Sequence, residues 1–89
     1  MHYMIIEKFH PGQVRTLYER FAIKGRLMPE GLHYIDSWID EEVTTCYQLM
    51  ESNDPGKIQE WIRHWSDLMD FEVIPVITSA QAKEKVLTG

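Results

Sequence analysis

The sequence has one cysteine, few basic residues and no long apolar run. The single Cys46 excludes an internal disulfide and suits a reducing cytoplasm. Nine Lys and Arg against 14 Asp and Glu give a net charge of −5, which disfavours nucleic acid and anionic membranes as partners, since both need a basic face. No segment approaches membrane-spanning length, and the N-terminus lacks a basic region and has an apolar run too short for a signal peptide. We therefore expect a cytoplasmic protein without a membrane or nucleic-acid partner.

Motifs that bind metals, phosphates or common cofactors are also missing. The histidines stand at positions 2, 10, 33 and 64, and no two of them have the i, i+4 spacing of a helical metal site. There is no second cysteine, phosphate-binding loop, nucleophile elbow or dinucleotide fingerprint. The sequence therefore predicts neither a metal nor a cofactor.

Aromatic residues, in contrast, are plentiful for so short a chain. The 89 residues are expected to form one domain, residues 1–89. A domain of this size buries only about 60–65% of its unfolded surface, so its core is thin. Three Trp, four Tyr and three Phe are a heavy load for such a core, and we expect some of these rings at an interface.

Hydrophobic periodicity and turn residues predict an α+β fold. The expected strands cover residues 2–9, 32–40, 44–51 and 71–77, and the expected helices cover 13–24 and 55–69. A short C-terminal helix is expected at 78–87, where Thr78 and Gln81 have the spacing of a capping box. Pro75 cannot donate to a strand ladder and puts the last strand at a sheet edge or a bulge. The order predicts a ferredoxin-like βαββαβ sandwich with both helices on one face of an antiparallel sheet.

The expected strand 32–40, LHYIDSWID, is unusual because large side chains stand on both of its alternating faces. A half-buried strand is normally apolar on one face and polar on the other. A short hairpin loop gives this strand and the next the same alternation. We assign the smaller set to the side packed against the helices: Ile35, Ser37, Ile39, Cys46, Gln48 and Met50. We assign the larger set to the opposite, bare face: Tyr34, Asp36, Trp38, Tyr47, Leu49 and Glu51.

The first and last strands are assigned by similar reasoning. Under the helices we place Met4, Ile6, Val73 and Pro75. On the bare face we place Tyr3, Ile5, Glu7, Phe9, Glu72, Ile74 and Val76. So much exposed apolar surface is unusual for a soluble monomer, and two-fold symmetry would pack this face onto its own copy. We therefore expect a homodimer, with these dimer-face residues: Tyr3, Glu7, Tyr34, Trp38 and Tyr47.

Acidic residues on the expected bare face are candidates for chemistry. Burial among like charges raises the pKa of some carboxylates, and such a group can act as a general acid or base or hold a cation. Asp36 and Glu51 are the candidate catalytic residues. The alternative is that the acids lie at a wet rim or pair with Lys8, Arg26 or Arg63.

A cavity between sheet and helices would have recognisable walls. Trp61 and Trp65 lie four positions apart on the inner stripe of their helix, which favours a core role over a ligand platform. If a cavity exists there, they would line it with Ser37 and Gln48. Cys46 is expected in the same layer as a small buried hydrophobe, because a catalytic thiol needs a nearby base and some exposure.

Two residues near the irregular segment 25–31 are further ligand-binding candidates. Arg26 could clamp a carboxylate ligand, or it could pair with Glu30. His33 could line a pocket beside this segment, and a histidine at a strand end is the plainer interpretation.

The runs GRLMPEGLHYIDSW, CYQLMESNDP and EWIRHWSDLMDFEVIPVITS together resemble a family of small bacterial proteins grouped as a domain of unknown function. The resemblance extends over nearly the whole chain. It implies the dimeric α/β-barrel fold, and it is more distant to the YCII-related proteins, the stress-responsive A/B barrel proteins and the antibiotic-biosynthesis monooxygenases. Proteins of this superfamily are typically dimers with a small-molecule pocket and varied chemistry, so the fold leaves the function open. The close family supplies no catalytic residue for this chain.

Three functions follow, in order of preference. The first is a cytoplasmic homodimer that binds a small organic ligand. The second is a cofactor-independent enzyme, monooxygenase- or cyclase-like, that uses a buried carboxylate for proton transfer. The third is a structural or protein-interaction module with no ligand.

Overall fold

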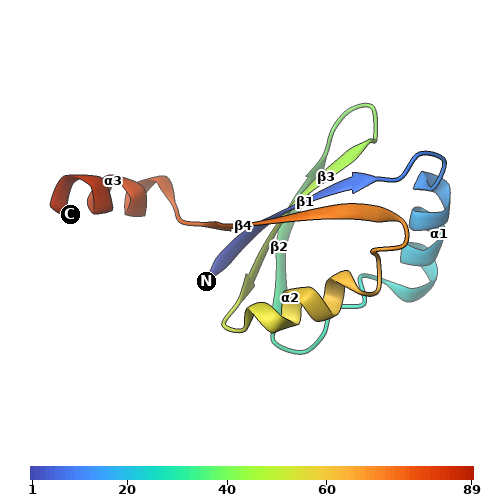
Figure 1. The fold of residues 1–89 in the computed structure, drawn as a ribbon, viewed down its shortest axis with the longest axis horizontal. Coiled ribbons are helices and arrows are strands. Elements are labelled where there is room, and N and C mark those ends of the chain that lie inside the picture. The colour runs from blue at the N-terminus through green and yellow to red at the C-terminus, as the bar shows by residue number, and fades with distance from the viewer.

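The computed structural model describes residues 1–89 and has the predicted order of elements. The elements are β1 (His2–Phe9), α1 (Val14–Lys24), β2 (Leu32–Ile39), β3 (Thr45–Ser52), α2 (Pro55–Ile62), β4 (Met69–Val76) and α3 (Ser79–Thr88). The strands form one antiparallel sheet in the order β2-β3-β1-β4. Helices α1 and α2 lie on one side of this sheet (Figure 1). The ferredoxin-like βαββαβ fold with an added C-terminal helix is therefore confirmed.

Helix α2 begins as its sequence predicts but ends early. The Asp54 side chain caps it by accepting a hydrogen bond from Gly56 N at 2.9 Å, and Pro55 occupies the first turn. The helix ends at Ile62 rather than near Met69, and the chain continues in tight turns, with Trp65 N donating to the Ile62 carbonyl at 2.9 Å. Trp65 nevertheless remains buried, so the apolar stripe still packs on the sheet after the helix has ended.

Strand β1 presents the opposite faces to those predicted. Ile5 pairs with Gln48, and Glu7 pairs with Cys46, so these residues face the helices. The exposed fractions of the Ile5 and Glu7 side chains are 0% and 4%. The assignment of Tyr3, Ile5, Glu7 and Phe9 to the bare face was wrong. The error arose because β1 has apolar residues on both sides, so alternation alone could not show which side faces the helices. The pairing with β3 determines the orientation of β1.

Strand β2 changes face part-way along because it contains a bulge. Tyr34 pairs with Met50, whereas Asp36 pairs with Leu49, so Ile35 is an extra residue between them. Tyr34 therefore lies on the helix side, and its assignment to the bare face of the sheet was wrong. Ile35 lies in the bulge and is exposed instead of packing beneath the helices. Beyond the bulge Asp36 and Trp38 share the bare face, as predicted.

The sheet side away from α1 and α2 is called the outer face below. Its apolar and acidic members include Met4, Ile6, Asp36, Trp38, Tyr47, Leu49, Glu51, Glu72, Ile74 and Val76. Trp38 and Tyr47 have exposed fractions of 55% and 41%. Pro75 lies in β4, an edge strand, which is the position its missing N–H requires.

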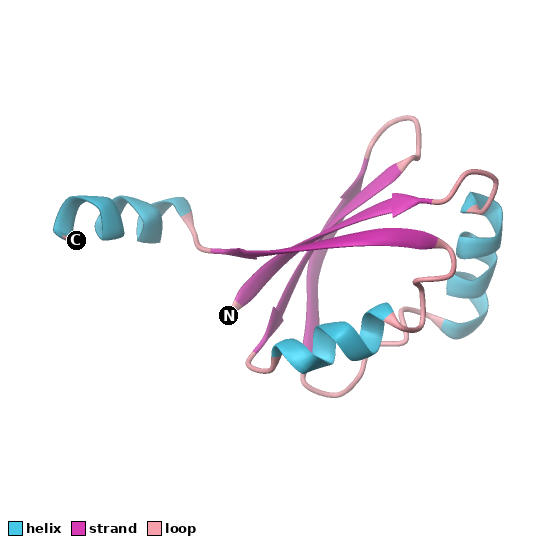
Figure 2. Cartoon of the chain, viewed as in Figure 1, coloured by secondary structure: helices cyan, strands magenta, loops and turns pink.

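Helix α3 extends beyond the sheet and contacts little of the domain (Figure 2). Thr78 and Gln81 form the predicted capping box, with Gln81 N donating to Thr78 Oγ1 at 3.0 Å and Thr78 N donating to Gln81 Oε1 at 2.9 Å. The helix has no buried residue, and Val86 has an exposed fraction of 79%. Neither α3 nor any other helix is long and apolar enough to cross a membrane.

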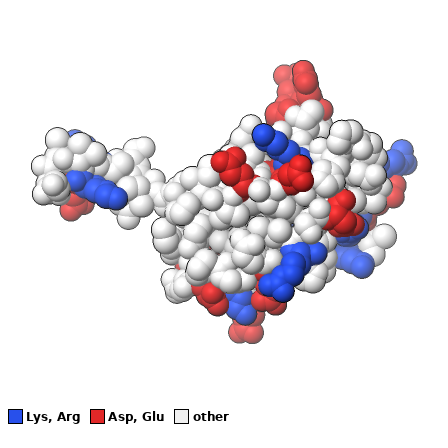
Figure 3. Space-filling view, in the orientation of Figure 1, with Lys and Arg blue, Asp and Glu red and all other residues white.

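Acidic and basic side chains are interspersed over the face seen in Figure 3.

Candidate functional site

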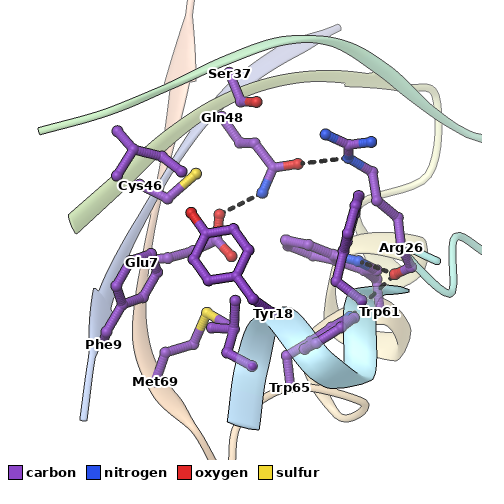
Figure 4. Close-up of a pocket in the computed structure, with 13 residues that line it drawn as sticks. Glu7, Phe9, Tyr18, Arg26, Ser37, Cys46, Gln48, Trp61, Trp65 and Met69 are labelled. Carbon is purple, nitrogen blue, oxygen red and sulfur yellow. Dashed lines mark hydrogen bonds between the residues drawn. The ribbon is translucent and has the colours of Figure 1, made fainter. Parts of the chain in front are cut away.

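A pocket of about 190 Å³ lies between the helix-facing side of the sheet and helices α1 and α2 (Figure 4). Nine of its 13 lining residues are hydrophobic. The lining residues are Glu7, Phe9, Leu17, Tyr18, Phe21, Arg26, Ser37, Ile39, Cys46, Gln48, Trp61, Trp65 and Met69. An apolar cavity with a few converging polar groups is the usual form of a small-molecule site.

The two tryptophans of the pocket are anchored to one backbone atom. Trp61 Nε1 donates to the Arg26 carbonyl oxygen at 2.9 Å, and Trp65 Nε1 donates to the same oxygen at 3.0 Å. Gly25 and Leu27, on either side of Arg26, both have positive φ, at 67° and 58°. The loop thus turns sharply on both sides of the carbonyl that fixes both indoles. Trp61 and Trp65 are buried core residues and also form one wall of the pocket.

The Arg26 side chain is stacked as well as hydrogen-bonded. Its guanidinium carbon lies 3.6 Å from the centre of the Tyr34 ring and 5.0 Å from that of Phe21. Its Nε donates to Gln48 Oε1 at 3.4 Å. Arg26 forms no ion pair, so the expected alternative of a pair with Glu30 is not observed.

Glu7 is the acid of this pocket. Its carboxylate accepts a hydrogen bond from Gln48 Nε2, which continues the line of polar groups from Arg26 into the pocket (Figure 4). Burial raises the pKa of Glu7 to about 6, although the hydrogen bonds from Gln48 and Cys46 and the charge of Arg26 act in the opposite direction. Glu7 therefore changes its charge close to neutral pH.

The thiol of Cys46 and the phenol of Tyr18, both near Glu7, stay neutral. Burial raises the pKa of the Cys46 thiol to about 12, and the negative charge of Glu7 adds to this effect. Burial is also the main cause of the raised pKa of Tyr18. Because the thiolate is the reactive form of cysteine, Cys46 is a poor nucleophile here.

Helix α1 supplies one wall of the pocket through Leu17, Tyr18 and Phe21, of which Leu17 alone is buried. Arg20 ties this helix to the turns after α2. Its Nη1 and Nη2 donate to the two carboxylate oxygens of Asp67 at 2.9 and 2.7 Å, and Nη1 also donates to the His64 carbonyl at 2.9 Å. The guanidinium carbon of Arg20 lies 5.6 Å from the centre of the Trp65 ring.

Several residues expected from the sequence to bind a ligand meet in this pocket. They are Arg26, Ser37, Gln48, Trp61 and Trp65. His33 does not line the pocket, because it precedes the bulge and pairs with Glu51 on the outer face. Whether the five lining residues bind a ligand stays a prediction.

The candidate catalytic acids lie elsewhere. Asp36 and Glu51 are on the outer face and do not line the pocket, whereas Glu7 does. Sequence reasoning placed Glu7 on the wrong face because the alternation of β1 is ambiguous. A useful signal was that Glu7 is the one acidic residue of β1 and directly follows the apolar run Met4–Ile6. No three His, Cys, Asp or Glu residues come together in a group that could hold a metal ion.

A family described as a domain of unknown function, DUF3303, matches residues 1–89. The chain belongs to the DUF3303 family. The resemblance to a family known as a domain of unknown function, inferred from three sequence runs, is thereby confirmed. No curated protein matches the chain.

A solved structure is similar to this DUF3303 protein. The solved protein is a candidate antibiotic biosynthesis monooxygenase from Chloroflexus aurantiacus J-10-fl, and it is 19% identical to this chain, with a TM-score of 0.44. The similarity covers 88% of the DUF3303 chain and 96% of the other chain. A likeness at this level carries no information about the chemistry of the pocket.

Proposed function

We propose that this DUF3303 protein is a homodimer in which each subunit binds a small organic molecule in the pocket between sheet and helices. The observation that supports this function is a preformed cavity with aromatic walls and one polar line, Glu7–Gln48–Arg26. Because protein cores are normally close-packed, a domain with a purely structural role would be expected to fill this space with side chains.

The volume limits the ligand. Pockets for drug-sized molecules measure roughly 300–1,000 Å³, and this one measures about 190 Å³. A compound of one or two rings fits this space. The rings of Trp61, Trp65 and Phe21 would contact its apolar part.

The homodimer is supported by the outer face. Trp38, Tyr47 and Ile74 are all more than one-third exposed there, beside the half-buried Leu49 and Met4. Large contiguous apolar surface on a small domain marks an interaction site, and a two-fold axis allows the same patch to cover itself. A free, buried Cys46 agrees with residence in the reducing cytoplasm.

Two naphthalene probes test the pocket: 2-naphthoate and its neutral amide, 2-naphthamide. We expect at least one of them to bind, as measured by protein-observed NMR titration. Ile39→Trp places a large ring in the pocket and is expected to weaken binding about tenfold or more, a loss of about 1.4 kcal/mol.

Ile35→Trp is the matched control. Ile35 lies on the same strand and has a similar exposed fraction, 44% against 40% for Ile39, but it does not line the pocket. This variant is expected to bind as the wild type does. Absence of binding by both probes, or equal binding by the two variants, would leave a structural or protein-interaction module as the better description.

A second candidate function is a cofactor-independent enzyme that transfers a proton, monooxygenase- or cyclase-like in its use of a buried carboxylate. It is favoured by Glu7, whose pKa of about 6 lies where a general base works well at neutral pH. Glu7 replaces Asp36 and Glu51 as the residue for this role, because it lines the pocket and they do not.

Deuterium exchange tests this second function. Phenylacetone, a small aryl ketone, is incubated with the protein in D₂O, and incorporation at its acidic C–H positions is followed by NMR. Acceleration that is lost in Glu7→Gln and kept in Asp36→Asn would support a base at Glu7. Equal rates with the wild type and Glu7→Gln would rule out this use of Glu7 on such a substrate.

A further inference from the structure

We infer that the pocket selects small organic acids, and that Nη1 and Nη2 of Arg26 bind the carboxylate of the ligand. This inference rests on the proposed ligand-binding function and adds the chemical class of the ligand. It follows from how Arg26 is held, from which of its donors are unused, and from the charges around it.

Arg26 is held from three directions. Its carbonyl accepts the hydrogen bonds of both indoles, at 2.9 and 3.0 Å. Its guanidinium lies against the Tyr34 ring, and its Nε donates to Gln48 at 3.4 Å. A side chain fixed in this way loses little conformational entropy when it binds a ligand.

The terminal nitrogens of Arg26 remain free for a ligand. No carboxylate of the chain forms an ion pair with Arg26, whereas Arg15 and Arg20 are both paired. Nε makes the one side-chain hydrogen bond of Arg26, to Gln48, and neither terminal nitrogen makes a marked contact in Figure 4. A guanidinium presents two parallel N–H donors that match the two oxygens of a carboxylate, a geometry that an ammonium group lacks.

Gln48 separates the arginine from the buried acid. Its amide oxygen accepts from Arg26, and its amide nitrogen donates to Glu7, so Glu7 does not itself occupy the guanidinium. The neutral Gln48 therefore stands between Arg26 and Glu7, where a direct ion pair would have occupied the N–H donors of Arg26. The positive charge of Arg26 is left available at the pocket wall.

A bound carboxylate would add a second negative charge near Glu7. The charged and titratable groups around Glu7 are Arg26, Cys46 and Tyr18, and the raised pKa values of Cys46 and Tyr18 keep these two neutral. Repulsion between the ligand and Glu7 therefore favours the protonated form of Glu7. Binding of an acid is expected to take up a proton and to tighten as the pH falls from 8 toward 6.

The first test compares 2-naphthoate with 2-naphthamide, which share a ring system and differ in charge. We expect the wild type to bind the acid about tenfold more tightly than the amide, measured by isothermal titration calorimetry. Arg26→Lys keeps a positive charge and the backbone carbonyl, and it is expected to reduce this preference for the acid over the amide to about twofold. Arg15→Lys, on the exposed side of α1, is the matched control and should keep the preference.

The second test follows the proton. Titrations of 2-naphthoate at pH 7 in buffers of different ionisation enthalpy should show proton uptake by the wild type and none by Glu7→Gln. Equal affinity for the acid and the amide, or an unchanged preference in Arg26→Lys, would overturn the inference while the ligand-binding function stands. Failure of both probes to bind would overturn the ligand-binding function and this inference together.

Discussion

The carboxylate of Glu7 on β1 accepts a hydrogen bond from the side-chain amide of Gln48 on β3, although the two residues are 41 positions apart in the sequence. Neither side chain is on the surface, and both line the pocket. A buried acid held by a neutral amide rather than by a cation keeps a raised pKa. This pair connects the stability of the domain to the pH at which the pocket changes its charge.

Glu7→Gln should change how stability depends on pH. In the folded protein the pKa of Glu7 is raised from 4.5 to about 6, so between these values the folded state binds more protons than the unfolded state. Stability due to Glu7 is therefore complete below pH 4.5 and is lost as the pH rises through about 6. The loss is about 2 kcal/mol in the free energy of unfolding, measured by urea denaturation at pH 4 and pH 7.5.

The Glu7→Gln protein should not show this loss, because a glutamine at position 7 does not titrate. Other titrating groups cancel in the comparison, among them His10, whose pKa is raised by its hydrogen bond to Asp70. An identical pH dependence in both proteins would contradict the raised pKa of Glu7.

Trp38→Lys should convert the proposed homodimer into a monomer. Trp38 stands on the outer face opposite Tyr47, and a charge there would be buried without a partner if two such faces packed together. Sedimentation velocity at micromolar concentration measures the change in mass. Ile23→Lys is the control, because Ile23 on α1 has an exposed fraction of 82% and lies away from the sheet. A wild-type protein that is already monomeric, or a Trp38→Lys protein that stays dimeric, would contradict an interface at the outer face.

Loss of the Arg20–Asp67 contact should loosen the α1 wall of the pocket. The two hydrogen bonds of this ion pair join α1 to the turns after α2, and the ion pair is partly exposed. A double-mutant cycle with Arg20→Ala and Asp67→Ala is expected to give a coupling free energy of about 0.5–1 kcal/mol. Amide exchange within Val14–Lys24 should also be faster in the Arg20→Ala and Asp67→Ala proteins than in the wild type.

The Arg15–Glu19 pair, four positions apart on the exposed side of the same helix, provides the reference cycle. Its coupling should be about 0.3–0.5 kcal/mol, the value for an exposed helical pair four positions apart. A coupling for Arg20 and Asp67 no larger than this, with unchanged amide exchange, would mean that their contact does not hold α1 in place.

Thr78→Ala should unfold α3 without changing the stability of the domain. The capping box is the main local support of this helix, and loss of such a cap costs about 1 kcal/mol. A helix of 10 residues is marginal by itself, and α3 has no buried residue. Amide exchange of residues 79–88 should become faster, while the urea midpoint stays the same.

Thr88→Ala, at the other end of α3, is the control for this experiment, and it removes a hydroxyl that donates to the Glu84 carbonyl. It should affect exchange much less, since it lies outside the first turn. A lower urea midpoint in Thr78→Ala would show that α3 packs on something in solution, a second copy of the chain being the first partner to test.

Periodicity and turn residues determined the order of elements, and with it the ferredoxin-like fold. The stripe containing Ile58 and Trp61, the Asp54 cap and the Thr78–Gln81 capping box are local features, and local physics is enough to place them. The same holds for Pro75 at the sheet edge, because a missing N–H excludes a central strand. Pocket-lining residues such as Trp65 and Gln48 could also be predicted from the sequence, since their place between sheet and helices follows from the fold.

Only the tertiary structure decided which faces β1 and the start of β2 present. Strand β1 is apolar on both sides, so nothing local distinguishes Ile5 from Ile6, and the pairing with β3 settles the question. The bulge at Ile35 turns Tyr34 toward the helices, and one extra residue in a strand has no signature in its alternation. The register of β1 with β3 places Glu7 in the pocket, and the register of β2 with β3 places the Tyr34 ring against the guanidinium of Arg26. The chemistry of the pocket therefore depends on long-range register, whereas the fold depends on patterns that are local in the sequence.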